Sequence, residues 1–306
     1  MAEARIGFMP PSMGAGGTPQ TFAAMLQSVE DAGLDHVTVG DHVSFHVGFG
    51  FDGLINATAL SMLHPRLPVH TAVYLLPLRH PVTVARQVAS LEQLAPGRLR
   101  FGVGIGGEDR REVANCGTDP RTRGRRMNEC LEILRPLLAG ETISYQGEFF
   151  DLDNASILPS PDPPTPIIVG GRSDAAIDRA GRYGDGWVAV WVTVDRWCEA
   201  MVRFEAAAAA AGRSDTDRQH GLLVWCGIAA DRESARKRVA EPMEMFYQTP
   251  FERFEKYTPY GTPADIAEFL APYAEAGTRD FHMVTIAGDE AEAIAGAGEI
   301  RRLLNR

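Results

Sequence analysis

The feature of this sequence that most constrains its fold is a regular alternation of short β-rich runs with amphipathic helical stretches. We predict strands at residues 5–9, 36–39, 69–75, 99–103, 167–169, 186–190, 222–229 and 280–286. Because each run is followed by a stretch in which apolar residues have helical spacing, the strands are expected to be parallel and joined by right-handed crossovers. Eight such units predict an α/β fold that closes into a (β/α)8 TIM barrel, with an open doubly wound sheet as the alternative.

Two segments depart from this alternation. Residues 141–165 contain YQGEFFDL, which is typical of a small hairpin, and then a proline-rich run. Residues 231–262, between the seventh and eighth predicted strands, are more than one helix needs, so we predict an insertion at the face of the barrel that carries the active site. No linker or shift in composition divides the chain, and we expect residues 1–306 to form one domain.

Charge and composition exclude several classes of protein. A formal net charge of −10 argues against a nucleic-acid partner, which requires a basic face. No apolar run reaches the roughly 18 to 20 residues of a membrane span, and the first residues do not resemble a signal peptide. The four cysteines form no CxxC or CxxH pair, which favours reduced structural thiols. We therefore expect a cytoplasmic protein that acts on a small molecule.

The carboxyl ends of the strands are where barrel enzymes carry their active sites. Gly170 and Gly171 follow the fifth predicted strand, which ends at Val169, and they precede a helix with Ser173 as its expected N-cap. Free N–H groups at a helix N-terminus bind anions, glycine lets a phosphate approach closely, and Arg172 can add a charge-assisted contact. An ordinary capped turn is the alternative, but the place of this turn after a late strand favours a phosphate site.

A second glycine-rich turn follows the fourth predicted strand, at Gly104, Gly106 and Gly107. It does not have the context of a dinucleotide-binding fingerprint, because no early βαβ unit frames it. We interpret it as a strand end without side chains, against which a flat ring can lie. Glu108 follows directly and is a reserve candidate for acid–base chemistry.

Asp41 and His42 form an acid–base pair at the end of the second predicted strand. Histidine is suited to proton transfer near neutral pH, although a buried structural pair is the alternative. His42 and His46 have the HxxxH spacing of metal ligands on a helix, but the glycines that follow disfavour a helix and no third ligand is evident. We predict no metal site. The glycine- and phenylalanine-rich residues 45–53 suggest an apolar loop over the site or, equally, core packing.

Two long blocks resemble the luciferase-like monooxygenase superfamily: TAVYLLPLRHPVTVARQVASLEQLAPGRLRFGVGIGG at 71–107 and PIIVGGRSDAAIDRAGRYGDGW at 166–187. GDH at 40–42 and GTPADIAEFL near the C-terminus are similar to the same family, so the resemblance covers nearly the whole chain. It implies the eight-stranded barrel and a cofactor that is either reduced flavin mononucleotide (FMN) or the deazaflavin coenzyme F420. It also implies a homodimer.

The Asp-His pair is similar to that of the F420-dependent branch, where the equivalent residues lie beside the deazaflavin ring. The resemblance further implies a non-proline cis peptide between Ala72 and Val73, which forms a bulge behind the ring. Some sugar-phosphate-oxidising members have an acid at the position of Gly107 and a tryptophan at that of His46. Both departures weaken the expectation of a sugar-phosphate substrate.

The leading hypothesis is therefore a coenzyme F420-dependent oxidoreductase that transfers a hydride between the deazaflavin and a small organic substrate. His42 would exchange the coupled proton, Asp41 would orient it or contact the ring, and Met9, His46 and Trp191 would line the substrate pocket. The predicted cofactor-binding residues are Asp41, Ala72, Val73, Gly104, Gly106, Gly107, Val169, Gly170, Gly171, Arg172 and Ser173. One alternative is an FMN-dependent monooxygenase that uses O2 and a separate reductase, and another is a binding protein that has lost its cofactor.

Overall fold

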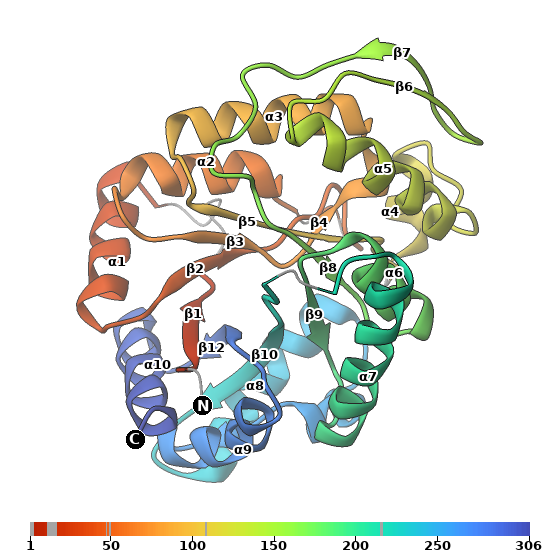
Figure 1. Cartoon of the computed structure of the whole chain (residues 1–306). Helices are drawn as coiled ribbons and strands as arrows, with labels where there is room; N and C mark the ends of the chain where they lie inside the picture. Colours follow the sequence, from red (N-terminus) through yellow and green to blue (C-terminus); the bar gives the residue numbers. More distant parts are fainter. Residues whose placement is uncertain (1–2, 11–16, 47, 49, 108, 215–216) are drawn as a thin grey trace.

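Eight parallel strands form a closed ring at the centre of the molecule (Figure 1). The computed structural model describes residues 3–10, 17–46, 48, 50–107, 109–214 and 217–306. In order around the ring, the strands are β1 (Arg5–Phe8), β2 (His36–Val39), β3 (Val69–Thr71), β5 (Leu99–Gly104), β8 (Ile167–Gly170), β9 (Gly186–Val190), β10 (Gly221–Ile228) and β12 (Asp280–Ile286). Because β10 pairs with both β9 and β12, and β12 with β1, the ring is closed. The predicted TIM barrel is confirmed.

Helices surround this ring, as Figure 1 shows. They are α1 (Pro19–Asp31), α2 (Gly53–Leu63), α3 (Pro81–Leu94), α4 (Arg110–Asn115), α5 (Arg123–Leu138), α6 (Asp174–Tyr183), α7 (Val194–Ala210), α8 (Arg232–Tyr247), α9 (Pro263–Glu275) and α10 (Glu290–Leu304). Ser173 is the N-cap of α6, as predicted, and Thr18 and Thr262 cap α1 and α9. Each of the three side chains accepts a hydrogen bond from a backbone N–H of the first turn. None of the helices in the described ranges is both long and apolar enough to span a bilayer.

The third barrel strand differs from the prediction. Instead of one strand over 69–75, the chain forms β3 and then β4 (Tyr74–Leu75), and both pair with β5. The bond between Ala72 and Val73 is a non-proline cis peptide and lies between the two short strands, as the family resemblance implied. A short 3-10 helix, η1 (Leu76–Leu78), follows.

The two irregular segments have the expected character. Residues 141–165 contain the antiparallel hairpin of β6 (Ile143–Gln146) and β7 (Asp151–Ala155). The insertion before the last barrel strand consists of α8, the 3-10 helices η2 (Phe251–Arg253) and η3 (Glu255–Tyr257), and β11 (Tyr260–Gly261). A small apolar core of its own, built around Met243, Phe251 and Phe254, holds the insertion together.

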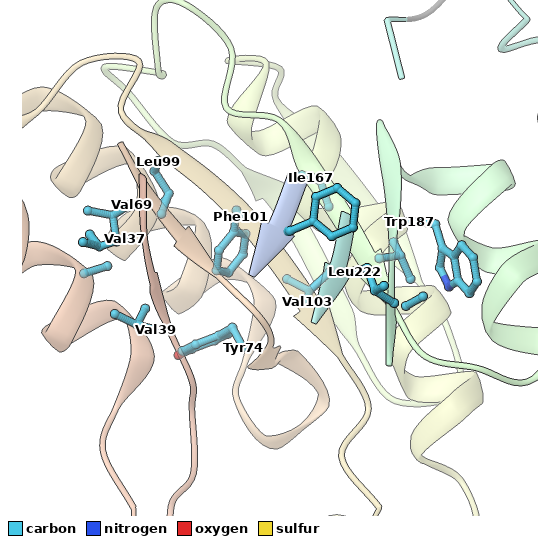
Figure 2. Close-up of a cluster of buried hydrophobic side chains, with 14 of the residues drawn as sticks. Val37, Val39, Val69, Tyr74, Leu99, Phe101, Val103, Ile167, Trp187 and Leu222 are labelled. Carbon is cyan, nitrogen blue, oxygen red and sulfur yellow. The ribbon is translucent and has the colours of Figure 1, made fainter. Parts of the chain in front are cut away.

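Rows of apolar side chains hold adjacent strands together and so fix the positions of the strand ends. Val37, Val69 and Leu99 occupy one register row across β2, β3 and β5, and Figure 2 shows them side by side. Phe101 faces Ile167 in the next pair of strands, and both are almost completely buried. Each such side chain stabilises the fold by about 1.5–3 kcal/mol through burial.

Three buried histidines lie near the amino ends of their strands, opposite the end that carries the site. His36 Nε2 lies 3.0 Å from His282 Nδ1, and the rings of His36 and His70 stack with centroids 3.9 Å apart. Burial lowers the pKa of His36 to about 3 and that of His282 to about 4, so these rings are neutral at physiological pH. Ring nitrogens of the three lie within 4.8 Å of one another, but the mutual hydrogen bond and the flat stack describe a packed core cluster.

Candidate active site

A cavity opens at the carboxyl ends of the strands and encloses about 1000 Å³, including the space at its mouth. It is lined by residues that follow β1, β2, β5, β8 and β9, by both residues of the cis peptide, and by aromatic side chains of the insertion. The predicted site residues found in this wall are Met9, Asp41, His42, Ala72, Val73, Gly104, Gly106, Gly170, Gly171 and Trp191. The barrel thus brings together residues from most of the predicted set.

Asp41 is a buried carboxylate whose two oxygens are both engaged by the protein itself. Arg79 donates to both oxygens, at 2.5 and 2.9 Å, and the backbone N–H groups of Gly53 and Leu75 donate at 2.9 and 2.8 Å. Burial raises the pKa of Asp41, and Arg79 and the two N–H groups limit the rise. Arg79 also contacts Asp52, the N-cap of α2, at 3.0 Å. Asp41 therefore joins three loops of the site.

His42 is oriented by Glu112 rather than by Asp41. Its Nδ1 lies 3.1 Å from Glu112 Oε2 and 3.3 Å from Oε1, and the Glu112 side chain is 2% exposed. The same carboxylate accepts hydrogen bonds from the backbone N–H groups of Val43 and Ser44. Burial alone would raise the pKa of Glu112, but these partners hold it below its ordinary value. Glu112 is thus ionised at neutral pH, and Nε2 is the His42 nitrogen left for the cavity.

The space beside two of the predicted glycines, Gly104 and Gly170, is filled by the side chain of Val73. A Cβ on Gly104 would lie 2.4 Å from Val73 Cγ2, and one on Gly170 would lie 2.6 Å from Val73 Cγ1. Both distances are far below van der Waals contact. The two glycines therefore make room for the side chain of Val73, a residue of the predicted bulge behind the ring, and this side chain covers the strand end that the sequence predicts to be bare.

We predict that Gly104→Ala lowers the free energy of unfolding by about 1–3 kcal/mol, because the new methyl group overpacks against Val73. Adding Val73→Ala to the same chain should recover part of this loss, as a double-mutant cycle from chemical denaturation would measure. Gly124→Ala is the control, since its nearest new contact is at 3.4 Å. Strictly additive losses in the cycle would contradict this packing.

The turn after β8 leads into the capped N-terminus of α6. Ser173 caps α6 by accepting a hydrogen bond from the N–H of Ala176, and Trp187 Nε1 donates to the carbonyl of Gly171 at 2.6 Å. The Arg172 side chain is exposed, and its guanidinium lies 5.3 Å from the centre of the Trp191 ring. On the neighbouring strand end, Arg123 comes within 3.1 Å of the position that a Cβ on Gly107 would occupy. Two guanidinium groups thus border the glycine turns.

The remaining predicted residues are placed differently. Val169 is completely buried in β8 and faces Gly184 beyond the end of α6, so its side chain cannot contact a ligand in the cavity. His46 does not form part of the cavity wall: its backbone N–H donates to Asp109 at 2.9 Å, and its Nδ1 lies 3.7 Å from the same carboxylate. Because His42 and His46 face different carboxylates, they do not form a shared ligand pair. Glu108 lies outside the described residues.

Sequence reasoning missed Glu112, Arg79 and the aromatic wall of the insertion. Asp109 caps α4, and Glu112 occupies its first turn, so this short helix holds residues 42–46 through both acids. An N-cap acid followed three residues later by another acid was the available signal. Phe246 and Tyr247, at the end of α8, lie in the cavity wall, and Phe246 contacts the rings of His42 and Phe45.

A model of the luciferase-like monooxygenase family matches residues 6–299. An F420-dependent hydroxymycolic acid dehydrogenase of Mycobacterium tuberculosis is 36% identical over 159 residues, which are 51% of this chain and 44% of that one. The chain thus spans less than half the length of that relative. An F420-dependent glucose-6-phosphate dehydrogenase of Kineococcus radiotolerans is 27% identical over 288 residues, 85% of each chain.

Among solved structures, an F420-dependent secondary alcohol dehydrogenase in complex with an F420-acetone adduct superposes with a TM-score of 0.86. The match covers 100% of both chains at 21% sequence identity. At this identity the likeness establishes the shared barrel fold.

Proposed function

The chain belongs to the luciferase-like monooxygenase family, and from this premise we propose that it is a coenzyme F420-dependent oxidoreductase. The reaction we propose is hydride transfer between the deazaflavin and a small organic substrate. The observation that carries the proposal is the His42–Glu112 pair, in which an ionised buried carboxylate holds a histidine in the cavity wall. Oxidation of an alcohol by hydride transfer also releases a proton, and this pair is suited to accept it.

The residues present fit the coenzyme. Gly106 and Gly171, together with the Val73 side chain that fills the space beside Gly104 and Gly170, form one wall of the cavity, against which a flat ring can lie. The capped N-terminus of α6 and the guanidinium of Arg172 supply N–H donors suited to the phosphate. Arg123, beside Gly107, would add positive charge for the anionic tail of the coenzyme. Relatives named as F420-dependent support the same assignment.

His42 and Glu112 account for the movement of the proton. When bound, the coenzyme supplies the ring carbon that accepts or donates the hydride. In the oxidising direction, the substrate alcohol loses a hydride from its carbon, and His42 Nε2 takes the proton of its hydroxyl group. The alcohol thereby becomes a carbonyl. The carboxylate of Glu112 stabilises the imidazolium that forms and fixes the ring through Nδ1. In the reducing direction, the same nitrogen returns the proton.

Asp41 is a positioning residue in this proposal. Its carboxylate is saturated by Arg79, Gly53 and Leu75, so it holds the backbone of His42 and β4 in place rather than exchanging a proton.

The family resemblance also favours a homodimer.

A fluorescence titration of the purified protein with F420 and, separately, with FMN tests the proposal. We expect saturable binding of F420 with an affinity at least about tenfold higher than that of FMN. Tight FMN binding without F420 binding, together with O2 uptake that depends on reduced flavin, would instead establish the FMN-dependent monooxygenase and its need for a separate reductase. Absence of binding to either would favour a protein that has lost its cofactor.

A further inference from the structure

A second hollow lies beside the cavity of the proposed active site. It encloses about 1400 Å³, including its open mouth, and we call it the apolar chamber. The two spaces meet around His42, because both are lined by Met9, Gly40, Asp41, His42, Trp225, Phe246 and Val284. Beyond these, the wall of the apolar chamber comes mainly from the ends of β1, β2 and β12 and from α8, with apolar side chains that include Phe8, Val39, Phe51, Met245 and Ile286.

The charges around the apolar chamber exclude an anionic occupant. Among the described residues of its wall there is no lysine or arginine. Asp289 and Glu290, both exposed, stand at the start of α10 and are negatively charged groups of the same wall. A phosphate or carboxylate would be repelled here and would find no cation to pair with. The chamber therefore suits an uncharged, largely apolar molecule.

One polar side chain in the chamber lacks a partner. The Oδ1 atom of Asn56 is buried and accepts no hydrogen bond from any described residue, and Asn56 as a whole is 9% exposed. Asn56 lies one helical turn after Gly53, which contacts Asp41, so it sits near the end of β2. An unsatisfied buried amide oxygen is costly, and a neutral hydroxyl donor in the chamber would satisfy it.

We propose that the apolar chamber binds the aliphatic part of an uncharged alcohol substrate and that Asn56 accepts a hydrogen bond from a second hydroxyl of that substrate, other than the one that reacts at His42. The reacting carbon lies at His42, where the chamber meets the active-site cavity, and the chain extends toward Met245 and Ile286. The redox step rests on the proposed function: the alcohol carbon gives a hydride to the coenzyme, its hydroxyl gives a proton to His42, and a ketone forms. Binding of the chain to the chamber does not depend on that step.

The first test measures binding without catalysis. Nile red is bound to the purified protein, and linear 1-alcohols from butanol to octanol are titrated in to displace it. We expect the affinity of the alcohols to rise about fourfold per methylene group, as burial of each group predicts. Octanoate should bind at least about tenfold more weakly than octanol because of the acidic wall. Equal affinity along the series, or stronger binding of octanoate, would overturn the proposal.

Variants locate the binding. Ala287 lines the chamber but not the first cavity, so Ala287→Phe should remove the gain in affinity with chain length, and Ala287→Leu should reduce it. Asn56→Leu should weaken alkanediols by about tenfold and should leave the affinity of the 1-alcohols, and their gain per methylene group, unchanged. Val202→Phe, at a residue that is 75% exposed, is the matched control and should behave as the wild type. A full chain-length gain in both Ala287 variants would place the alcohols elsewhere and overturn the proposal.

A ladder of 2-alcohols assayed with F420 separates this inference from the proposed function. A specificity constant that rises with chain length in the wild type and stays flat in Ala287→Phe supports both. If 2-propanol is oxidised but the specificity constant does not rise for longer alcohols, the proposed function is supported and the proposal that the apolar chamber binds the chain is wrong. Displacement of Nile red by alcohols in a protein that does not bind F420 would overturn the proposed function and support the chamber.

Discussion

Replacement of His42 by alanine is expected to lower the turnover number for hydride transfer by about 10²–10⁴-fold, with a change in the dissociation constant of the coenzyme of less than about threefold. His42 forms part of the cavity wall, and its Nε2 is the nitrogen not engaged by Glu112. Loss of the imidazole leaves the substrate proton without an acceptor but removes little of the cavity wall. Steady-state kinetics for turnover and fluorescence titration for F420 affinity measure the two quantities separately.

Two further variants make this expectation specific. Glu112→Gln keeps the shape of the side chain but removes the charge that stabilises an imidazolium, so it should lower turnover by about 10–10²-fold. His46→Ala should change turnover only a few-fold, because His46 faces Asp109 and does not form part of the cavity wall. Equal losses in turnover and coenzyme affinity for His42→Ala would identify His42 as a structural residue and contradict its role in proton transfer.

The barrel was predictable because its signal is local and repeated. Each strand and helix carries its own pattern of apolar residues, and eight repetitions leave few ways to arrange them. The same reasoning placed Asp41, His42 and the glycine turns at one end of the barrel, because all of them follow strands. What local patterns could not predict was the pairing between distant side chains.

His42 illustrates this limit. Sequence adjacency suggested Asp41 as its orienting partner, yet successive residues in an extended chain point to opposite sides. Asp41 turns toward Arg79, and the ring of His42 meets Glu112, a residue 70 positions away. Gly104 and Gly170 are a second case. The sequence predicts backbone contact with a ring at Gly104 and with a phosphate at Gly170, but the missing side chains of both also make room for Val73, which only the packed structure reveals.

The largest expected loss of stability comes from Arg79→Met. We predict that this substitution lowers the free energy of unfolding by about 3–5 kcal/mol, because it leaves the buried carboxylate of Asp41 without its cation. The side chain of Asp41 is 0% exposed and that of Arg79 is 17% exposed, so water cannot replace the lost partner. Arg79 also contacts Asp52 and lies over the ring of Tyr74. Its replacement therefore removes contacts that join the chain segments at β2, β4 and α2. Guanidinium-induced unfolding measures the loss.

The origin of this loss can be tested by removing the charge in two ways. The double variant Asp41→Asn, Arg79→Met has no unpaired buried charge and should be more stable than Arg79→Met alone, although it has lost the ion pair. Acidification should also stabilise Arg79→Met, because it neutralises the same carboxylate. Without Arg79, burial raises the pKa of Asp41 further above its unfolded value. Since a raised folded-state pKa favours the folded protein at low pH, the deficit of Arg79→Met relative to the wild type should shrink between pH 7.5 and pH 5. A deficit that is the same at both pH values, and unchanged by Asp41→Asn, would mean that lost packing of the arginine stem, not the stranded carboxylate, destabilises the variant.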